Sequence, residues 1–284
     1  MRVQGVARRL PLLVGHHWPA SRHEVQARAG KHGSQTPTAS TRRKHRGRRE
    51  EIALSTYVLI PGAGGAATWY WHRVVPLLEQ AGQAAIPVDL PGPDEQAGLP
   101  EYARLVSDAV TGSGAGPDVV LVAQSMGGFT VPLVPALVPV RAIVLVNAMI
   151  PRPGETAGAW WENTGAAPAR IEAAQAGGYP AEFDEREYFL HDLTPEVVAS
   201  GADHQHNEAE AAFATPCDFA AWPAVPTRVV AGADDRFFPA GFQRAVARDR
   251  LGIEADLLPG GHLMALSRPA PLADYLLEVT AAGR

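Results

Sequence analysis

Residues 119–128 read VVLVAQSMGG, an apolar run that ends at a serine between small side chains. The aliphatic residues predict a short buried strand, and the glycines after the serine indicate a sharp turn into a helix. A serine in such a strained turn tolerates only small residues two positions away on either side, as Ala123 and Gly127 are. The stretch therefore predicts a nucleophilic Ser125, with the backbone N–H of Met126 aimed where an oxyanion would form.

Similar short apolar runs recur along the chain and alternate with amphipathic segments. This alternation is typical of a parallel sheet covered by helices. The strands are predicted over 56–60, 84–89, 119–123, 142–147, 227–231 and 255–258, and the helices over 69–80, 100–110, 126–137, 239–250 and 271–281. We expect an α/β fold with a six-stranded, mostly parallel sheet and helices on both faces.

One connection is far longer than the others. About 75 residues lie between Met149 and Pro226, in the connection between two consecutive strands, whereas connections of 2–6 residues are common. We expect a helical cap at about 150–225. We interpret the aromatic residues of this segment mostly as the core of the cap and in part as an apolar wall for a ligand. They include Trp160, Trp161, Tyr179, Phe183, Tyr188, Phe189, Phe213 and Phe219.

Basic residues are concentrated at the start of the chain. Of the 25 Lys and Arg residues, 12 lie within residues 1–50, which hold only two of the 30 acidic residues. Residues 22–49 have almost no branched apolar residues and no periodicity, and we expect residues 1–52 to form a disordered extension before a domain at 53–284. The domain is strongly acidic and would repel phosphate backbones and anionic lipid, which argues against nucleic-acid or membrane binding.

The basic cluster at 42–49 is compatible with a nucleic-acid or targeting patch, but we interpret it as a solvated tail. No apolar run approaches the roughly 18 residues of a membrane-spanning helix. The only cysteine is Cys217, which excludes an internal disulfide framework and fits a reducing compartment. A cytoplasmic location is therefore expected.

The partners of the serine are expected further along the chain, in the order acid and then histidine. The predicted strand at 227–231 leads into GADDRFFP at 232–239, which offers Asp234 and Asp235 beyond a strand end. The spacing to the proline favours Asp235 as the residue that orients an imidazole, with Asp234 as a turn former. The last strand leads into PGGHLM at 259–264, where His262 follows two glycines. We therefore predict a triad of Ser125, Asp235 and His262.

A second oxyanion donor is expected from the loop after the first strand, PGAGG at 61–65, and we choose the backbone N–H of Ala63. A phosphate-binding loop is a poor alternative, because the motif lacks its Lys and the domain contains no lysine. Asp203, His204, His206 and Glu208 cluster in the cap, but their spacing is poor for a metal, so no metal site is expected.

On these segments the chain resembles the α/β-hydrolase superfamily, and within it the branch of plant-type methylesterases, hydroxynitrile lyases and their bacterial relatives. The resemblance covers residues 56–281 and is carried by PGA at 61–63, WYWH at 69–72, PVDLPG at 87–92, QSMGG at 124–128, Asp235, and GHLMALS at 261–267. The chain departs from that branch at Pro61, where a His is usual, at Ala123, where a Gly is usual, and at Gln124.

The resemblance implies a serine hydrolase that cleaves a carboxylic ester of a small, largely apolar substrate through an acyl-enzyme, without a cofactor. Similar hydroxynitrile lyases carry a Lys after the catalytic His and a Thr in the oxyanion loop, where this chain has Leu263 and Gly62. A lyase or C–C hydrolase, and a non-catalytic small-molecule receptor on the same fold, are the alternatives. The resemblance does not indicate an oligomeric state.

Overall fold

The structure is a computed structural model that describes residues 54–204 and 206–281. The predicted extension at 1–52 lies outside the described residues. None of the helices in the described ranges combines the length and the apolar character that crossing a bilayer requires.

A six-stranded sheet runs through the domain in the order β2-β1-β3-β4-β5-β6, and every neighbouring pair is parallel. The strands are β1 (Thr56–Ile60), β2 (Ala84–Pro87), β3 (Val119–Gln124), β4 (Ala142–Val146), β5 (Thr227–Gly232) and β6 (Ala255–Leu258). All six lie where the sequence predicts them, and β3 occupies the middle of the sheet. The loops that follow the strands meet at one edge, where open parallel sheets bind ligands.

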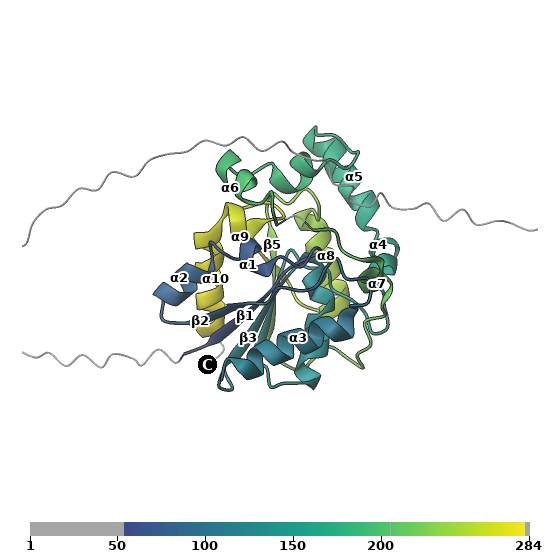
Figure 1. Cartoon of the computed structure of the whole chain (residues 1–284). Helices are drawn as coiled ribbons and strands as arrows, with labels where there is room; N and C mark the ends of the chain where they lie inside the picture. Colours follow the sequence, from purple (N-terminus) through teal and green to yellow (C-terminus); the bar gives the residue numbers. More distant parts are fainter. Residues whose placement is uncertain (1–53, 205, 282–284) are drawn as a thin grey trace, which may run out of the picture. The chain divides into compact units, whose positions relative to one another are not determined.

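Helices cover both faces of this sheet, as Figure 1 shows for α3 on one side and α2 and α10 on the other. The helices of the α/β framework are α1 (Ala67–Tyr70), α2 (Val75–Gln80), α3 (Leu99–Gly112), α8 (Ala240–Leu251), α9 (Met264–Ser267) and α10 (Pro269–Ala281). The strands supply a separate apolar core to each layer. Val58 and Ile60 of β1 pack toward α3, whereas Tyr57 and Leu59 pack toward α10, because successive strand residues point to opposite faces.

The segment after Ser125 differs from the single helix predicted over 126–137. It forms two 3₁₀ helices, η1 (Ser125–Phe129) and η2 (Val131–Ala136). The N–H of Thr130 donates to the Gly127 carbonyl at 3.0 Å, a bond across three residues. Pro132 and Pro135 explain the difference, because proline has no N–H and its ring clashes with the carbonyl four residues earlier in an α-helix.

Helices also fill the long connection between β4 and β5, residues 147–226, which we call the insertion. They are α4 (Ala157–Thr164), α5 (Ala166–Gly177), the π-helical turn η3 (Arg186–Leu190), α6 (Pro195–Ser200) and α7 (Glu210–Ala214). Trp160 and Tyr188 are buried, as expected for aromatic residues that form the core of this segment. Phe189 instead lies against the site described next.

Candidate active site

Ser125 directly follows the central strand β3 and has a φ angle of +49°. Positive φ is uncommon for a residue other than glycine and costs conformational energy, which marks the sharp turn that the sequence predicts. The carbonyl of Ser125 accepts the N–H of Met149 at 2.9 Å, so the turn is tied to the segment after β4. The serine is thereby held at the edge where the strands end.

His262 lies in the turn after β6 and reaches Ser125 across the strand ends. Its Nε2 is 3.1 Å from Ser125 Oγ, and its Nδ1 is 2.9 Å from Asp235 Oδ2. When Nδ1 carries the hydrogen, it donates to the carboxylate and leaves Nε2 as the acceptor for the serine hydroxyl. Ser125, His262 and Asp235 form a continuous hydrogen-bonded chain although each comes from a different loop.

Of the two neighbouring aspartates, Asp235 is the one that contacts the histidine. Its Oδ1 accepts the N–H groups of Phe237 at 2.8 Å and Phe238 at 2.9 Å. These backbone bonds fix the carboxylate and satisfy the oxygen that does not contact His262. Asp234 is exposed and accepts the N–H of Gly260 at 3.1 Å, which links the loops after β5 and β6.

Asn147, which the sequence analysis did not identify as a site residue, connects the loops that carry the acid and the histidine. It follows β4, is fully buried and has a φ of +47°. Its Oδ1 accepts the N–H of Gly232 at 2.6 Å, and its Nδ2 donates to the carbonyls of Gly261 at 2.9 Å and His262 at 3.1 Å. The available signal was a polar residue directly after a central apolar strand.

Gln243 of α8 is a second buried residue that the sequence did not reveal. Its side-chain nitrogen lies 3.1 Å from Asp235 Oδ2 and 2.6 Å from the Phe238 carbonyl. It therefore donates to the same carboxylate oxygen that accepts from His262. Its position in an amphipathic helix gives no local pattern that distinguishes it from a solvent-facing glutamine.

Three phenylalanine rings enclose the imidazole of His262. The ring centroids of Phe189, Phe237 and Phe238 lie 5.1, 5.0 and 5.1 Å from that of the histidine. Phe237 and Phe238 follow Asp235, whereas Phe189 comes from η3 of the insertion. These rings exclude water from the hydrogen-bonded chain, and a lower local dielectric strengthens its polar contacts.

The two predicted oxyanion donors belong to backbones that lie against each other. A Cβ on Gly62 would collide with Gln124 Oε1 and lie 2.9 Å from Ser125 Cβ, so the loop at 62–65 packs directly on the turn at the serine. Within the described part of the chain, no residue accepts a hydrogen bond from the N–H of Ala63 or Met126. The assignment of these two N–H groups as oxyanion donors stays a prediction.

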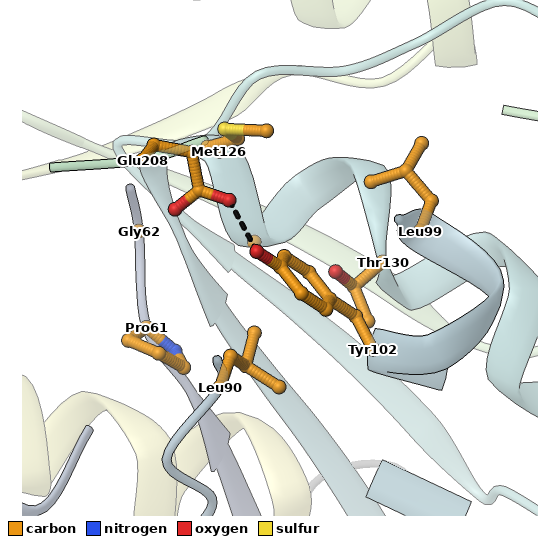
Figure 2. A pocket seen from close by; sticks show the side chains of 9 residues that line it. Pro61, Gly62, Leu90, Leu99, Tyr102, Met126, Thr130 and Glu208 are labelled. Carbon is orange, nitrogen blue, oxygen red and sulfur yellow. Dashed lines mark hydrogen bonds between the residues drawn. The ribbon is translucent and has the colours of Figure 1, made fainter. Parts of the chain in front are cut away.

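The next N–H along this loop, that of Gly64, is already occupied. It donates to Glu208 Oε2 at 2.6 Å, and Glu208 Oε1 accepts the hydroxyl of Tyr102 at 2.5 Å. Figure 2 shows this carboxylate and tyrosine beside Gly62 and Met126. Burial raises the pKa of Glu208, and the two hydrogen bonds only partly offset that effect.

Two of the residues considered as metal ligands, His204 and Glu208, contact different neighbours. Glu208 binds Gly64 and Tyr102, whereas the ring of His204 stacks on Trp69 with centroids 6.2 Å apart. Among the described residues, no group of three His, Cys, Asp or Glu side chains is arranged to hold a metal ion.

Comparison with known proteins is consistent with this geometry. A model of the alpha/beta hydrolase family matches residues 57–275. Probable esterase PIR7A of Oryza sativa subsp. indica is 35% identical over 111 residues, which are 36% of this chain and 42% of that protein. Methylesterase 7 of Arabidopsis thaliana is 35% identical over 105 residues, 34% of this chain and 40% of that protein. The chain thus aligns with about two-fifths of the length of these curated relatives.

The likeness to solved structures extends over more of the chain. The crystal structure of a pyrethroid hydrolase from Sphingobium faniae JZ-2 superposes with a TM-score of 0.65 at 23% identity, over 81% of this chain and 98% of that one. At this identity the likeness establishes the fold, and it confirms the expected α/β architecture. Because the family model spans most of the residues in the sequence, the chain belongs to the alpha/beta hydrolase family.

Proposed function

We propose that this protein is a serine hydrolase that cleaves a carboxylic ester of a small, largely apolar substrate through an acyl-enzyme. The observation that carries the proposal is the hydrogen-bonded chain from Ser125 Oγ through His262 to Asp235. A serine hydroxyl is a weak nucleophile unless an adjacent base removes its proton, and a base works best when a third group fixes its orientation. All three groups lie within hydrogen-bond distance.

The first half of the reaction forms the acyl-enzyme. Ser125 Oγ attacks the ester carbonyl carbon as its proton passes to Nε2 of His262, while Asp235 stabilises the resulting imidazolium. The carbonyl oxygen becomes an oxyanion and accepts the free N–H groups of Ala63 and Met126. When the intermediate collapses, the C–O bond to the alcohol breaks and His262 returns the proton to the departing alkoxide oxygen.

The second half releases the acid. A water molecule gives a proton to Nε2 of His262 as its oxygen attacks the acyl carbon, and the same two N–H groups stabilise the second oxyanion. Collapse breaks the bond to Ser125 Oγ, which recovers its proton from His262. The products are one alcohol and one carboxylic acid, and the enzyme is regenerated.

An apolar substrate is favoured by the side chains around the reacting groups. Phe189, Phe237 and Phe238 surround His262 and provide apolar surface beside the reacting groups. Some relatives of the family carry the names esterase and methylesterase. Leu263 follows the histidine where cyanohydrin cleavage would need a cation for the departing cyanide, which favours ester hydrolysis over that lyase reaction.

The protein acts on a single small-molecule substrate in this proposal, and no cofactor, nucleic acid or membrane takes part. A cytoplasmic location belongs to the same proposal and is supported by the lone, buried Cys217. Fractionation of cells that express the chain would test it, and recovery outside the cytoplasm would contradict it.

The decisive experiment compares the purified protein with a Ser125→Ala variant on a panel of p-nitrophenyl esters that runs from acetate to octanoate and includes benzoate. We expect activity in the native chain and a loss of at least about 10³-fold in kcat for Ser125→Ala, because the nucleophile is removed. Ser113→Ala, at the exposed end of α3, is the matched control and should keep full activity.

Covalent labelling with a fluorophosphonate distinguishes an inactive protein from a wrong choice of ester. Labelling of the native chain at Ser125, absent in Ser125→Ala, supports the activated nucleophile. Failure of both labelling and hydrolysis would overturn the proposal. Ester turnover that survives Ser125→Ala would also overturn it.

A further inference from the structure

A short segment of the insertion lies directly against the loop that carries Ala63. The N–H of Ala209 donates to the Gly92 carbonyl at 2.7 Å, and a Cβ on Gly64 would collide with the carbonyl oxygen of His206. Gly64 has a φ of +88°, a backbone conformation that glycine adopts without strain. Residues 206–209 therefore meet the loop at 62–65 along its backbone.

Glu208 is the only side chain of this segment that is buried and charged, and it points into that contact. It is 7% exposed, and its two oxygens accept from Gly64 N–H and the Tyr102 hydroxyl. The space around them is too narrow for a water molecule and is otherwise lined mainly by apolar groups, among them Leu90, Leu99 and Met126 (Figure 2). With Glu208 in place, no water molecule fits between the carboxylate and the loop, so the contact with the Gly64 N–H is direct.

The loop needs such an anchor. Gly62, Gly64 and Gly65 flank Ala63, and Gly65 also has a positive φ, of +79°. A glycine-rich loop has more backbone freedom than any other sequence, so its N–H groups hold one direction only if further contacts fix them. The N–H groups of Ala63 and Gly64 belong to consecutive planar peptide units joined at the Ala63 Cα, so once the Gly64 unit is fixed, only the φ and ψ angles of Ala63, a non-glycine residue, set the direction of the Ala63 N–H.

We propose that Glu208 is a positioning residue for the oxyanion hole. By accepting the Gly64 N–H, it holds the loop so that the Ala63 N–H points to the oxygen bound beside Ser125, and Tyr102 in turn holds Glu208. The oxyanion hole is then complete only when residues 206–209 of the insertion are in place. This inference rests on the proposed function, because it assigns a role within the same reaction.

The test uses Glu208→Ala, Glu208→Gln and Tyr102→Phe in the full-length protein. For each we would measure kcat and KM for the best ester, the inhibition constant of phenylboronic acid, and the fraction of active sites by fluorophosphonate titration. Boronic acids form a tetrahedral adduct with the serine whose oxygen occupies the oxyanion hole, so their affinity reports on that hole. Glu210→Ala, exposed and two residues away, is the matched control.

We expect Glu208→Ala to lower kcat per active site and phenylboronic acid affinity together, by about 10–100-fold, with KM changed less than about threefold. The complete loss of one oxyanion donor costs more, about 10²–10³-fold. Glu208→Gln keeps a carbonyl acceptor for Gly64 and should recover most of the lost activity. Tyr102→Phe should lie between the two.

Unchanged kcat per active site and unchanged boronic acid affinity in Glu208→Ala would overturn the proposal, even if the variant melts at a lower temperature. If Glu208→Ala does not fold, equal values for Tyr102→Phe and the native chain would overturn it instead. If the proposed ester hydrolysis itself were wrong, the result would differ: the native chain would neither hydrolyse esters nor react with the fluorophosphonate.

Discussion

Two buried carboxylates join the insertion to the α/β framework, and they are held in opposite ways. Glu155, just before α4, forms two hydrogen bonds with the guanidinium of Arg250 on α8 and accepts from Asn163 Nδ2 at 2.8 Å. Glu208, at the other end of the insertion, accepts only from Gly64 and Tyr102 among the described residues. One carboxylate has a cation and the other has none.

The pKa values of these two carboxyl groups are shifted in opposite directions. Burial alone would raise the pKa of Glu155, but the hydrogen bonds from Arg250, Asn163 and the Arg152 backbone outweigh it, and the pKa falls below its usual range. For Glu208 burial prevails and the pKa is raised. The donors to Glu208 are uncharged, so they offset the cost of burial less than the Arg250 guanidinium and its companion donors do for Glu155.

An ion pair thus anchors one end of the insertion to α8, whereas a carboxyl with uncharged hydrogen-bond donors anchors the other end to the loop that packs on the turn at Ser125. The first should contribute mainly to stability and the second mainly to catalysis. Three changes test this division.

The largest effect on stability is expected from Glu155→Ala. The side chain of Arg250 is 1% exposed, and removal of Glu155 leaves this buried guanidinium with only an exposed carboxylate, that of Asp249, 3.8 Å from its Nε. We expect a loss of about 3–5 kcal/mol in the free energy of unfolding, measured by urea denaturation. The rate per titrated active site should stay within about twofold of the native value, because Glu155 lies outside the reacting groups.

The control for this change is Glu254→Ala, which breaks an exposed pair with Arg248. It should alter stability little, since solvent screens such pairs. A Glu155→Ala variant that stays stable but loses turnover per site would contradict the division between the two anchors.

A smaller effect should appear in the pH dependence of stability. The folded pKa of Glu155 is lowered, so its contribution is present above the unfolded value of 4.5 and is lost as the pH falls through the folded pKa. The folded pKa of Glu208 is raised, so its contribution is present below 4.5 and is lost as the pH rises through the folded pKa. Each can change stability by at most about 1.4 kcal/mol per pH unit.

Glu155→Gln should therefore remove part of the acid destabilisation, and Glu208→Gln should remove a destabilisation that develops as the pH rises. Melting temperatures recorded between pH 3 and 8 would reveal the two opposite changes against an exposed control, Glu210→Gln. If the curves of melting temperature against pH are parallel for all three variants, neither carboxyl has a different pKa in the folded and the unfolded protein.

Residues that directly follow a strand were predicted more successfully than residues whose contacts are with distant parts of the chain. The strand positions were confirmed, and the structure joins Ser125, Asp235 and His262 in one hydrogen-bonded chain. Each of the three was predicted from a short local pattern of strand, small residue and turn. Glu208 has no such pattern. Its contact with Gly64 joins residues 144 positions apart, and the sequence singled it out only as one of four poorly spaced candidates for a metal ligand.

Asn147 and the segment after Ser125 were both predicted incompletely from the sequence, for different reasons. Asn147 was included in a strand, but its role depends on two loops more than 80 residues further along the chain. The helix predicted over 126–137 follows apolar periodicity, yet Pro132 and Pro135 impose 3₁₀ geometry. In the first case the information is in the tertiary contacts, and in the second it was present locally but was outweighed by the apolar pattern.

The smallest change in stability is expected when both partners of an anchor become apolar. Glu155→Leu with Arg250→Met removes the charges together, and such replacements are often neutral or stabilising. We expect urea midpoints near the native value and normal turnover. Glu208→Leu with Tyr102→Phe should also fold with little loss, but it leaves the Gly64 N–H without an acceptor, so turnover and phenylboronic acid affinity should fall as in Glu208→Ala. Equal turnover in the two double variants would show that any well-packed anchor serves, and that the position of Glu208 beside the oxyanion loop has no catalytic consequence.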